Sequence, residues 1–309
     1  MAMSLAEEII LCVGYAIIFF ANIVGNLFVC AVVLKTKYLQ NFTSILIVNM
    51  AVGDLIVGVS GVIHIVLEVW FLVSGKNNNT VFCGRLNGIT FFSASISIYT
   101  MAVLAFDRYL SIVKPVIRRG TLTKGKLKFI LPAIWILSLV FFGSSMYFIE
   151  IYDFKDDKLI CWETLPQDEL PVSYRIILFA AMYFIPMCIT MYFFGKIFVH
   201  LWIGNPCISL ATSQVLLKSR HRLTKILGSV ILLFNICWLP WFVVELLLSF
   251  DSRLGRHEVL QSALALLAVT HSSMNPFIYS FQSQNFRQHI RRITKRNRPQ
   301  LSKAKKVTK

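Results

Sequence analysis

Residues 82–115 read FCGRLNGITFFSASISIYTMAVLAFDRYLSIVKP, and this stretch sets the class of the protein. It is apolar over a length that crosses a bilayer, and it closes with Asp107-Arg108-Tyr109. An acid and a base beside the hydrocarbon core are costly, so charges in such places commonly serve a function. We therefore predict a membrane-spanning helix here, with a functional charge pair at one of its mouths.

The composition extends this prediction to the whole chain. Of the 309 residues 56% are hydrophobic and 15% charged, and the mean hydropathy is +0.67, a balance that soluble domains rarely reach. Seven apolar runs have spanning length, at residues 8–34, 43–71, 81–113, 128–150, 173–203, 223–250 and 258–281. We predict an all-α membrane protein, a seven-transmembrane helix bundle over residues 8–281. Residues 1–7 are expected to form a short extracellular tail, 282–296 a membrane-surface amphipathic helix and 297–309 a basic cytoplasmic tail.

The charges indicate which side of the membrane each loop occupies. The net charge of +16 would suit a nucleic-acid partner, but most of the 31 Lys and Arg lie on one side of the predicted spans. The 15 Asp and Glu lie on the other side, Asp54 and Asp107 excepted. Basic loops stay cytoplasmic, which predicts a multi-pass plasma-membrane protein with an extracellular N-terminus and no nucleic-acid partner. Apolar residues at Phe286, Ile290 and Ile293 recur among arginines, as in a helix that lies on membrane lipids.

Asp54 lies near the middle of the second run. A carboxylate at the bilayer centre costs about 3 kcal/mol or more, so Asp54 must face the bundle interior. Two interpretations stay open, a protonated hydrogen-bonded carboxyl or a proton or cation site. Ser97, Ser272 and Asn275 could add oxygen ligands of the kind that a hard cation prefers. A sodium ion at Asp54 is the one cofactor that we expect.

Two features belong to the outer face. Cys83 opens the third run and Cys161 lies in the loop after the fourth, both in an oxidising compartment, so they form a disulfide or remain free thiols. The same loop is rich in acids, among residues 150–169. These acids either keep the loop soluble or raise the association rate of a cationic ligand.

The sixth run carries Phe234 and Trp238 one turn apart, just before Pro240. Aromatic residues at this spacing most often belong to the hydrophobic core. Beside a proline kink, they could also convert ligand contact into rotation of the inner half of the helix.

The ordered set of motifs resembles the rhodopsin-like (class A) G-protein-coupled receptors over residues 8–296. The motifs are Asp107-Arg108-Tyr109, Asn275-Pro276-x-x-Tyr279, Cys237-Trp-x-Pro240, Asp54, Asn26, Trp135 and the Cys83/Cys161 pair. The resemblance implies a transducer and not an enzyme. It also implies that Asp107 holds Arg108 at rest and releases it to a heterotrimeric G protein, with arrestin and a receptor kinase as further partners.

The resemblance assigns further roles. Val116 would insert into the G protein, and Asn275 and Tyr279 would connect the Asp54 network to Arg108. A transmission group below the pocket would consist of Ile98, Pro186 and Phe234, with Trp238 above it.

The chain departs from the family at two places. Phe194 replaces a tyrosine that is usual in the family, and Arg220 replaces an acid that pairs with the switch arginine in many relatives. We hypothesise that the resting lock is weak.

The ligand class follows in part from exclusions. Thr90 stands where amine receptors carry Asp, and Val269 where opsins carry the retinal lysine. The expected pocket consists of Thr90, Ala94, Trp238, Trp241 and Phe242, with Glu68 and Glu245 as acids on its rim.

The outer loop adds a preference among the remaining ligands. Residues 161–166 are similar to a Cys-x-Glu-x-x-Pro pattern of many peptide receptors, in which this loop forms an open hairpin. We therefore favour a cationic neuropeptide as ligand, with a non-amine small molecule, nucleoside- or lipid-like, as the alternative. A transporter or channel is the remote alternative. It would be expected to have inverted repeats and several mid-membrane charges, whereas the sequence shows no repeat and Asp54 is its main mid-membrane charge.

Overall fold

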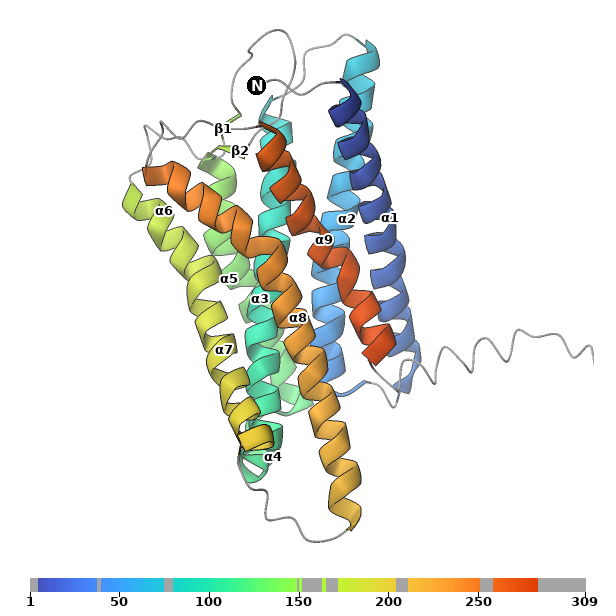
Figure 1. Cartoon of the computed structure of the whole chain (residues 1–309), viewed down its shortest axis with the longest axis vertical. Helices are drawn as coiled ribbons and strands as arrows, with labels where there is room; N and C mark the ends of the chain where they lie inside the picture. Colours follow the sequence, from blue (N-terminus) through green and yellow to red (C-terminus); the bar gives the residue numbers. More distant parts are fainter. Residues whose placement is uncertain are drawn as a thin grey trace, which may run out of the picture.

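The computed structural model describes residues 5–37, 40–74, 80–148, 150–151, 163–164, 172–203, 211–250 and 258–282. Within these ranges, seven helical columns lie side by side (Figure 1), which confirms the predicted bundle. The columns are α1 (Leu5–Lys35), α2 (Phe42–Ser74), α3 (Thr80–Ile112), α5 (Leu127–Phe148), the run of α6 (Val172–Phe179), η3 (Ala180–Phe184), α7 (Ile185–Phe198) and η4 (Val199–Ile203), then α8 (Ala211–Phe250) and α9 (Glu258–Gln282).

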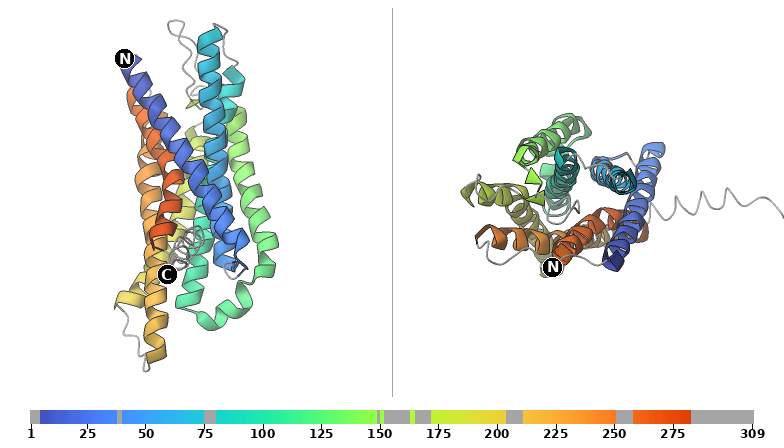
Figure 2. Two further views of the ribbon diagram at one scale, coloured as in Figure 1. Left: turned by 90° about the vertical axis from the view of Figure 1, so that its right-hand side faces the viewer. Right: turned by 90° about the horizontal axis from the view of Figure 1, so that it is seen from above.

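The columns form a ring that is filled by α3 (Figure 2). Helix α3 contacts α2, α5, α7 and α8, and the ring closes where α1 packs on α9. Two short helical segments, α4 (Pro115–Thr121) and η2 (Lys124–Lys126), connect α3 to α5. The two-residue strands β1 (Glu150–Ile151) and β2 (Glu163–Thr164) lie in the loop between α5 and α6.

One helix is clearly longer than its apolar run. Helix α8 begins at Ala211, whereas the sequence pattern placed the start near residue 223. The added turns carry Lys218, Arg220 and Arg222, which hydropathy excludes from a span but which are good helix formers in water.

Four of the described helical stretches meet the length and hydropathy expected of a span on their own, at Ile9–Lys35, Phe42–Leu67, Ile176–Ile203 and His221–Leu248. Helix α3 is more polar because it packs against protein instead of lipid. Its Ser93, Ser95 and Ser97 are all buried, and Ser93 donates to the backbone oxygen of Gly53 in α2. Polar side chains inside such a bundle find partners on neighbouring helices.

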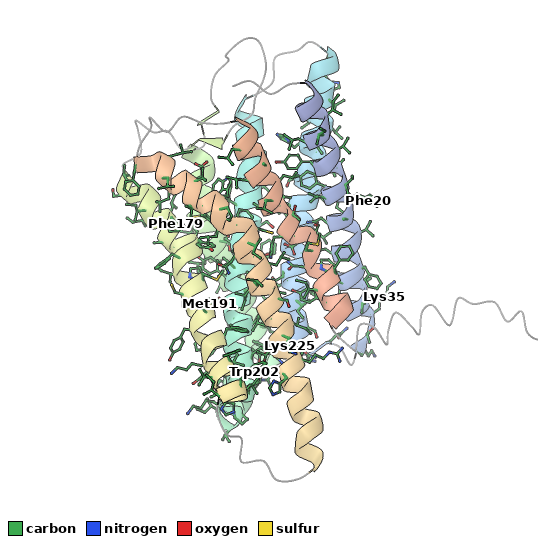
Figure 3. The ribbon with its side chains drawn as sticks, in the orientation of Figure 1. Phe20, Lys35, Phe179, Met191, Trp202 and Lys225 are labelled. Carbon is green, nitrogen blue, oxygen red and sulfur yellow. The ribbon has the colours of Figure 1, made fainter. Side chains whose placement is uncertain are left out.

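The outward faces of the columns are apolar. Phe20 on α1 and Met191 on α7 are 72% and 50% exposed, and Phe20 lies at the outer edge of the bundle (Figure 3). Such a surface suits a lipid environment, in which apolar side chains face outward.

Two contacts fix α1 against α9. A Cβ atom on Gly25 would lie 2.9 Å from Cγ of Pro276, so only glycine permits this approach. Directly beside it, the side-chain amide of Asn26 donates to the backbone oxygens of Asn22 at 3.1 Å and Ser272 at 3.0 Å. Asn26 therefore joins the first and last columns, as expected for an amide in an apolar helix.

One amide ties three helices. Nδ2 of Asn49 in α2 donates to Oγ1 of Thr100 in α3 at 2.8 Å. Its Oδ1 accepts from Nε1 of Trp135 in α5 at 2.9 Å. Both polar ends of the amide are therefore used between helices, where an unpaired amide would be expensive.

The proline of the fifth column is compensated by a tyrosine. Just before Pro186, the chain forms the π-helical segment η3, in which the N–H of Ile185 bonds to the oxygen of Ala180. The next carbonyl in that frame, Ala181, faces Pro186, which has no N–H to donate. The hydroxyl of Tyr99 in α3 donates to this carbonyl at 2.9 Å.

Several predicted features lie outside the described residues. These are the Cys161 half of the expected disulfide and the side chain of Cys83, the tail before residue 5, and the amphipathic helix and basic tail after residue 282.

Candidate functional site

A buried ion-pair cluster lies at one end of α3. Asp107 is fully buried, and its Oδ2 accepts from Arg108 Nε at 3.1 Å and Nη2 at 2.5 Å. Thr43, in the first turn of α2, donates to the same oxygen at 2.8 Å. Arg108 is also bonded to the Thr43 hydroxyl, and its side chain is only 12% exposed. Arg108 is therefore held by its neighbouring acid and by the adjacent helix.

A second arginine completes the cluster. Arg118, on α4, reaches Oδ1 of Asp107 with Nε at 3.1 Å and Nη2 at 3.0 Å. Val116 on the same short helix is 84% exposed, which leaves it accessible to a partner. One carboxylate thus anchors both Arg108 and the short helix that carries Val116.

Sequence reasoning missed Thr43 and Arg118. Arg118 had one usable signal, because Pro115 favours a new helix start and Arg118 follows it by three residues on the same face. Thr43 had none, since its contact joins residues 64 positions apart.

Two aromatic residues of α7 pack against neighbouring helices. Tyr109 lies beside Phe193 of α7, with ring centroids 5.2 Å apart. Phe194 faces α8, where a Cβ atom on Gly228 would lie 2.8 Å from its Cζ atom. The residue that replaces the usual tyrosine therefore fills a space that a glycine leaves open on α8.

The predicted polar cluster forms around Asp54. Nδ2 of Asn275 donates to its Oδ2 at 2.9 Å, and Ser97 lies 3.4 Å from its Oδ1. The Ser272 side chain also hydrogen-bonds to the carboxylate. Oδ1 of Asn275 is buried without a hydrogen-bond partner among the described residues.

This donor set fits sodium better than a transition metal. No group of three or more His, Cys, Asp or Glu side chains comes together in the described part of the chain. The ligands present are one carboxylate, two hydroxyls and an orphaned amide oxygen, all hard oxygen donors.

Tyr279 lies one turn from this cluster. It is buried, and its hydroxyl is 3.8 Å from Sδ of Met50, which precedes Asp54 by one turn on α2. His271, four residues before Asn275, is buried. Its ring contacts that of Phe234 edge-on, with centroids 4.9 Å apart. The last column therefore links the Asp54 cluster to the sixth helix as well as to α2.

The predicted transmission group is buried as a unit. Ile98, Pro186, Phe234 and Trp238 all lie in the interior. The rings of Phe234 and Trp238 stack with centroids 6.0 Å apart.

A polar contact that the sequence did not reveal lies beside the transmission group. The ring of Tyr183 in η3 stacks on that of Phe234, with centroids 6.2 Å apart. Its hydroxyl donates to Oδ1 of Asn235 in α8 at 2.7 Å. The hydrogen bond connects the fifth column to the sixth next to the aromatic stack.

The expected ligand pocket has an aromatic floor. Phe91 joins this floor to the predicted transmission group. Its ring centroid lies 4.7 Å from that of Trp241 and 5.9 Å from that of Trp238. Phe242 packs on Trp241 at 5.3 Å, and Ala94 is buried in the same core cluster. Phe91 was not predicted, although it follows Thr90 directly.

Of the two predicted rim acids, the structure describes the side chain of Glu245 alone. Glu245 is half-buried on α8. The side chains of Glu68 and Thr90 lie outside the described set, so their roles stay predictions.

The described residues of the outer loop form two short paired strands. Strands β1 and β2 pair antiparallel, with Glu150 opposite Thr164 and Ile151 opposite Glu163. Strand β1 also contacts α3. This antiparallel pair therefore borders the end of the bundle that is opposite to α4 (Figure 1).

The chain is similar in sequence to several known receptors. The rat neuropeptide FF receptor 1 is 29% identical over 89% of this chain and 67% of its own length. The RYamide receptor of Drosophila melanogaster is 26% identical over 91% of this chain, and the sheep bombesin receptor subtype-3 is 28% identical over 90%. This chain spans 62% of the RYamide receptor and 73% of the bombesin receptor.

A family model described as "7 transmembrane receptor (rhodopsin family)" matches residues 25–279. That range contains the Asp107 cluster, the Asp54 cluster and the aromatic stack. Its members are receptors, so the prediction of a receptor that is not an enzyme is confirmed, and the transporter and channel alternatives are set aside. The chain belongs to the rhodopsin family of seven-transmembrane receptors.

Proposed function

We propose that this receptor lies in the plasma membrane with its N-terminus outside and couples an extracellular cationic peptide to heterotrimeric G proteins. The observation that carries the proposal is the Asp107 cluster. A buried carboxylate holds Arg108 at the end of the bundle where Val116 is exposed, so release of Arg108 would prepare that end for a partner. The positive charge of the loops at this end supports a cytoplasmic location.

The peptide assignment rests on the outer end. The three relatives named above are receptors for neuropeptide FF, RYamide and bombesin by name. The paired strands β1 and β2 and the acidic sequence of their loop suit an extended, positively charged ligand. The aromatic floor of Phe91, Trp241 and Phe242 keeps a non-amine small molecule, nucleoside- or lipid-like, as the second candidate.

In mechanism, the protein is an allosteric coupler. Ligand and G protein each bind better to a state in which Arg108 is free, so each raises the affinity of the other by the same factor, about 5- to 150-fold. Movement would pass from the pocket through Trp238 and Phe234 to α8. Arrestin, a receptor kinase and membrane lipids complete the set of proposed partners.

A ligand screen tests the proposal. Cells that express the chain receive basic and amidated peptides, with nucleosides, amines and lipids in parallel, and a second messenger is measured. We expect a saturable response to a cationic peptide, with the half-maximal concentration about tenfold higher in Glu245→Gln. Glu7 is an acid on α1, and Glu7→Gln is the matched control. A response to a small molecule that Glu245→Gln leaves unchanged would replace the peptide by the second candidate.

We further propose that sodium binds at Asp54 and favours the resting state. The orphaned Oδ1 of Asn275 and the hydroxyls of Ser97 and Ser272 support this site. Replacing sodium by N-methylglucamine at constant ionic strength should raise agonist affinity in the wild type, and this effect should vanish in Asp54→Asn.

Two serines one turn apart on α3 provide the control for the sodium site. Ser97→Ala should weaken the sodium effect, because Ser97 faces Asp54. Ser93→Ala should not, because Ser93 is bonded to the oxygen of Gly53. Sodium dependence that survives in Asp54→Asn would refute the site.

A further inference from the structure

An amide in the apolar part of α8 is bonded to the fifth column. Asn235 is half-buried and follows Phe234 directly. Its Oδ1 accepts from the hydroxyl of Tyr183 at 2.7 Å, and its Nδ2 donates to Sδ of Met187 at 3.3 Å. The same Nδ2 also donates to the backbone oxygen of Ile231 at 2.8 Å, within α8. Both polar ends of the amide are therefore used, which offsets the cost of an amide in an apolar helix.

Aromatic contacts fix the ring of Tyr183 beside this bond. Tyr183 belongs to the π-helical segment η3, of a kind that often occurs at functional sites, and it is buried. Its ring stacks on that of Phe234, which precedes Pro240. It also packs on Phe242, which follows Pro240, with ring centroids 4.6 Å apart. One ring therefore touches α8 on both sides of the proline, and its hydroxyl bonds to the arm before it.

The bond occurs in the resting arrangement of the inner end. In the structure, Arg108 is paired with Asp107, and the proposed function requires Arg108 to be free for coupling. The charged residues of α8 before residue 223 are all positive, so none of them can form an ion pair with Arg108. The resting position of α8 therefore depends on contacts elsewhere along the helix.

A tilt of α8 at Pro240 would break the bond to Tyr183. Asn235 lies five residues before Pro240, on the arm that would move, whereas Tyr183 lies on the fifth column. Hydrogen bonds weaken steeply with distance and angle, so a further separation of about 1 Å is enough to end this one. The bond is thus made in one state and absent from the other, and only such differential interactions shift an equilibrium.

We propose that the hydrogen bond between Tyr183 and Asn235 holds α8 in the resting state and so sets the basal activity of the receptor. Both are positioning residues, since neither is assigned to the ligand pocket or to the Asp107 cluster. The proposal rests on the proposed function in one respect, the coupling of α8 movement to a G protein. Ligand contact at Trp238, three residues after Asn235, would open the bond from the outer side.

The first test follows the movement of α8 and needs neither ligand nor G protein. Cys237 on α8 is 1% exposed, so methanethiosulfonate ethylammonium reaches its thiol only when α8 leaves its resting packing. The rate of modification in the purified full-length receptor is measured by peptide mass spectrometry. We expect this rate to rise about three- to tenfold in Tyr183→Phe and in Asn235→Leu, the effect of one interhelical hydrogen bond among membrane helices. The double variant should match the single variants, because all three lack the same bond.

Tyr99→Phe is the matched control. It also removes a tyrosine hydroxyl that is bonded to η3, at the oxygen of Ala181 and 2.9 Å away, but this hydroxyl comes from α3 and not from α8. We expect it to leave the Cys237 rate unchanged, whereas a general loosening of the bundle would raise the rate in both tyrosine variants. Wild-type rates in Tyr183→Phe and Asn235→Leu would overturn the proposal, and so would an equal rise in Tyr99→Phe.

The second test measures basal nucleotide exchange on a panel of purified heterotrimeric G proteins, at equal receptor concentrations and without ligand. We expect exchange to be about three- to tenfold faster with Tyr183→Phe than with the wild type, and unchanged with Tyr99→Phe. Faster exchange together with a faster Cys237 rate supports the proposal. A faster Cys237 rate without faster exchange would overturn the G-protein coupling in the proposed function, while the hold on α8 by Tyr183 and Asn235 would stand.

Discussion

We expect Arg108→Ala to abolish agonist-stimulated G-protein activation while the receptor still reaches the cell surface. Signalling fails because the guanidinium that would meet the G protein is gone. Surface expression survives because Asp107 is not orphaned, since Thr43 still donates at 2.8 Å and Arg118 at 3.0 and 3.1 Å. Second-messenger output is measured beside surface antibody labelling in the same cells.

The cluster also supplies the controls for Arg108→Ala. Arg118→Ala removes an arginine from the same carboxylate, and we expect it to keep a saturable agonist response. The double variant Arg108→Ala/Arg118→Ala removes both cationic partners that Asp107 has among the described residues, at a cost of about 3–5 kcal/mol. It should fail to reach the surface. A strong agonist response in Arg108→Ala would contradict the assigned switch.

The second large effect concerns stability. Gly25→Ala places a methyl group 2.9 Å from Cγ of Pro276, a ring fixed to the backbone of α9, so the helices must separate. Overpacking costs about 2 kcal/mol, and loss of the Asn26 bond to Ser272 adds about 1 kcal/mol. We expect the melting temperature of the solubilised Gly25→Ala receptor to lie about 6 °C or more below that of Gly14→Ala, which gains the same helix propensity.

Gly14 on the same helix is the matched control. A Cβ atom there would meet Cδ2 of Leu266 at 3.5 Å, an ordinary contact with a flexible side chain. Both substitutions gain the same helix propensity, so the difference between them isolates the contact with Pro276. Equal melting temperatures for Gly14→Ala and Gly25→Ala would show that α1 and α9 are not tightly packed at this point.

The bundle was predictable because each span must satisfy its own backbone in lipid, which makes length and hydropathy strong signals. The Asp54 cluster was predictable for a related reason, since a mid-membrane acid needs polar neighbours and few were available. The contacts of Arg118, Thr43 and Tyr99 were not predictable. Each joins residues from separate helices or loops, and the rotation of each helix about its axis is set by packing that no local pattern records. The start of α8 was also misplaced, because hydropathy locates the bilayer and not the end of a helix that continues into water.

The length of α8 has a mechanical consequence. Its 40 residues extend about 60 Å, against about 30 Å for the hydrocarbon core, and it extends past the other columns (Figure 1). Ala211 lies 29 residues before Pro240, so the arm below the proline is about 44 Å long. Each degree of tilt at Pro240 therefore moves the free end by about 0.8 Å. A displacement at Trp238 too small to break a contact would become, at the far end of this lever, a gap wide enough for another protein to enter.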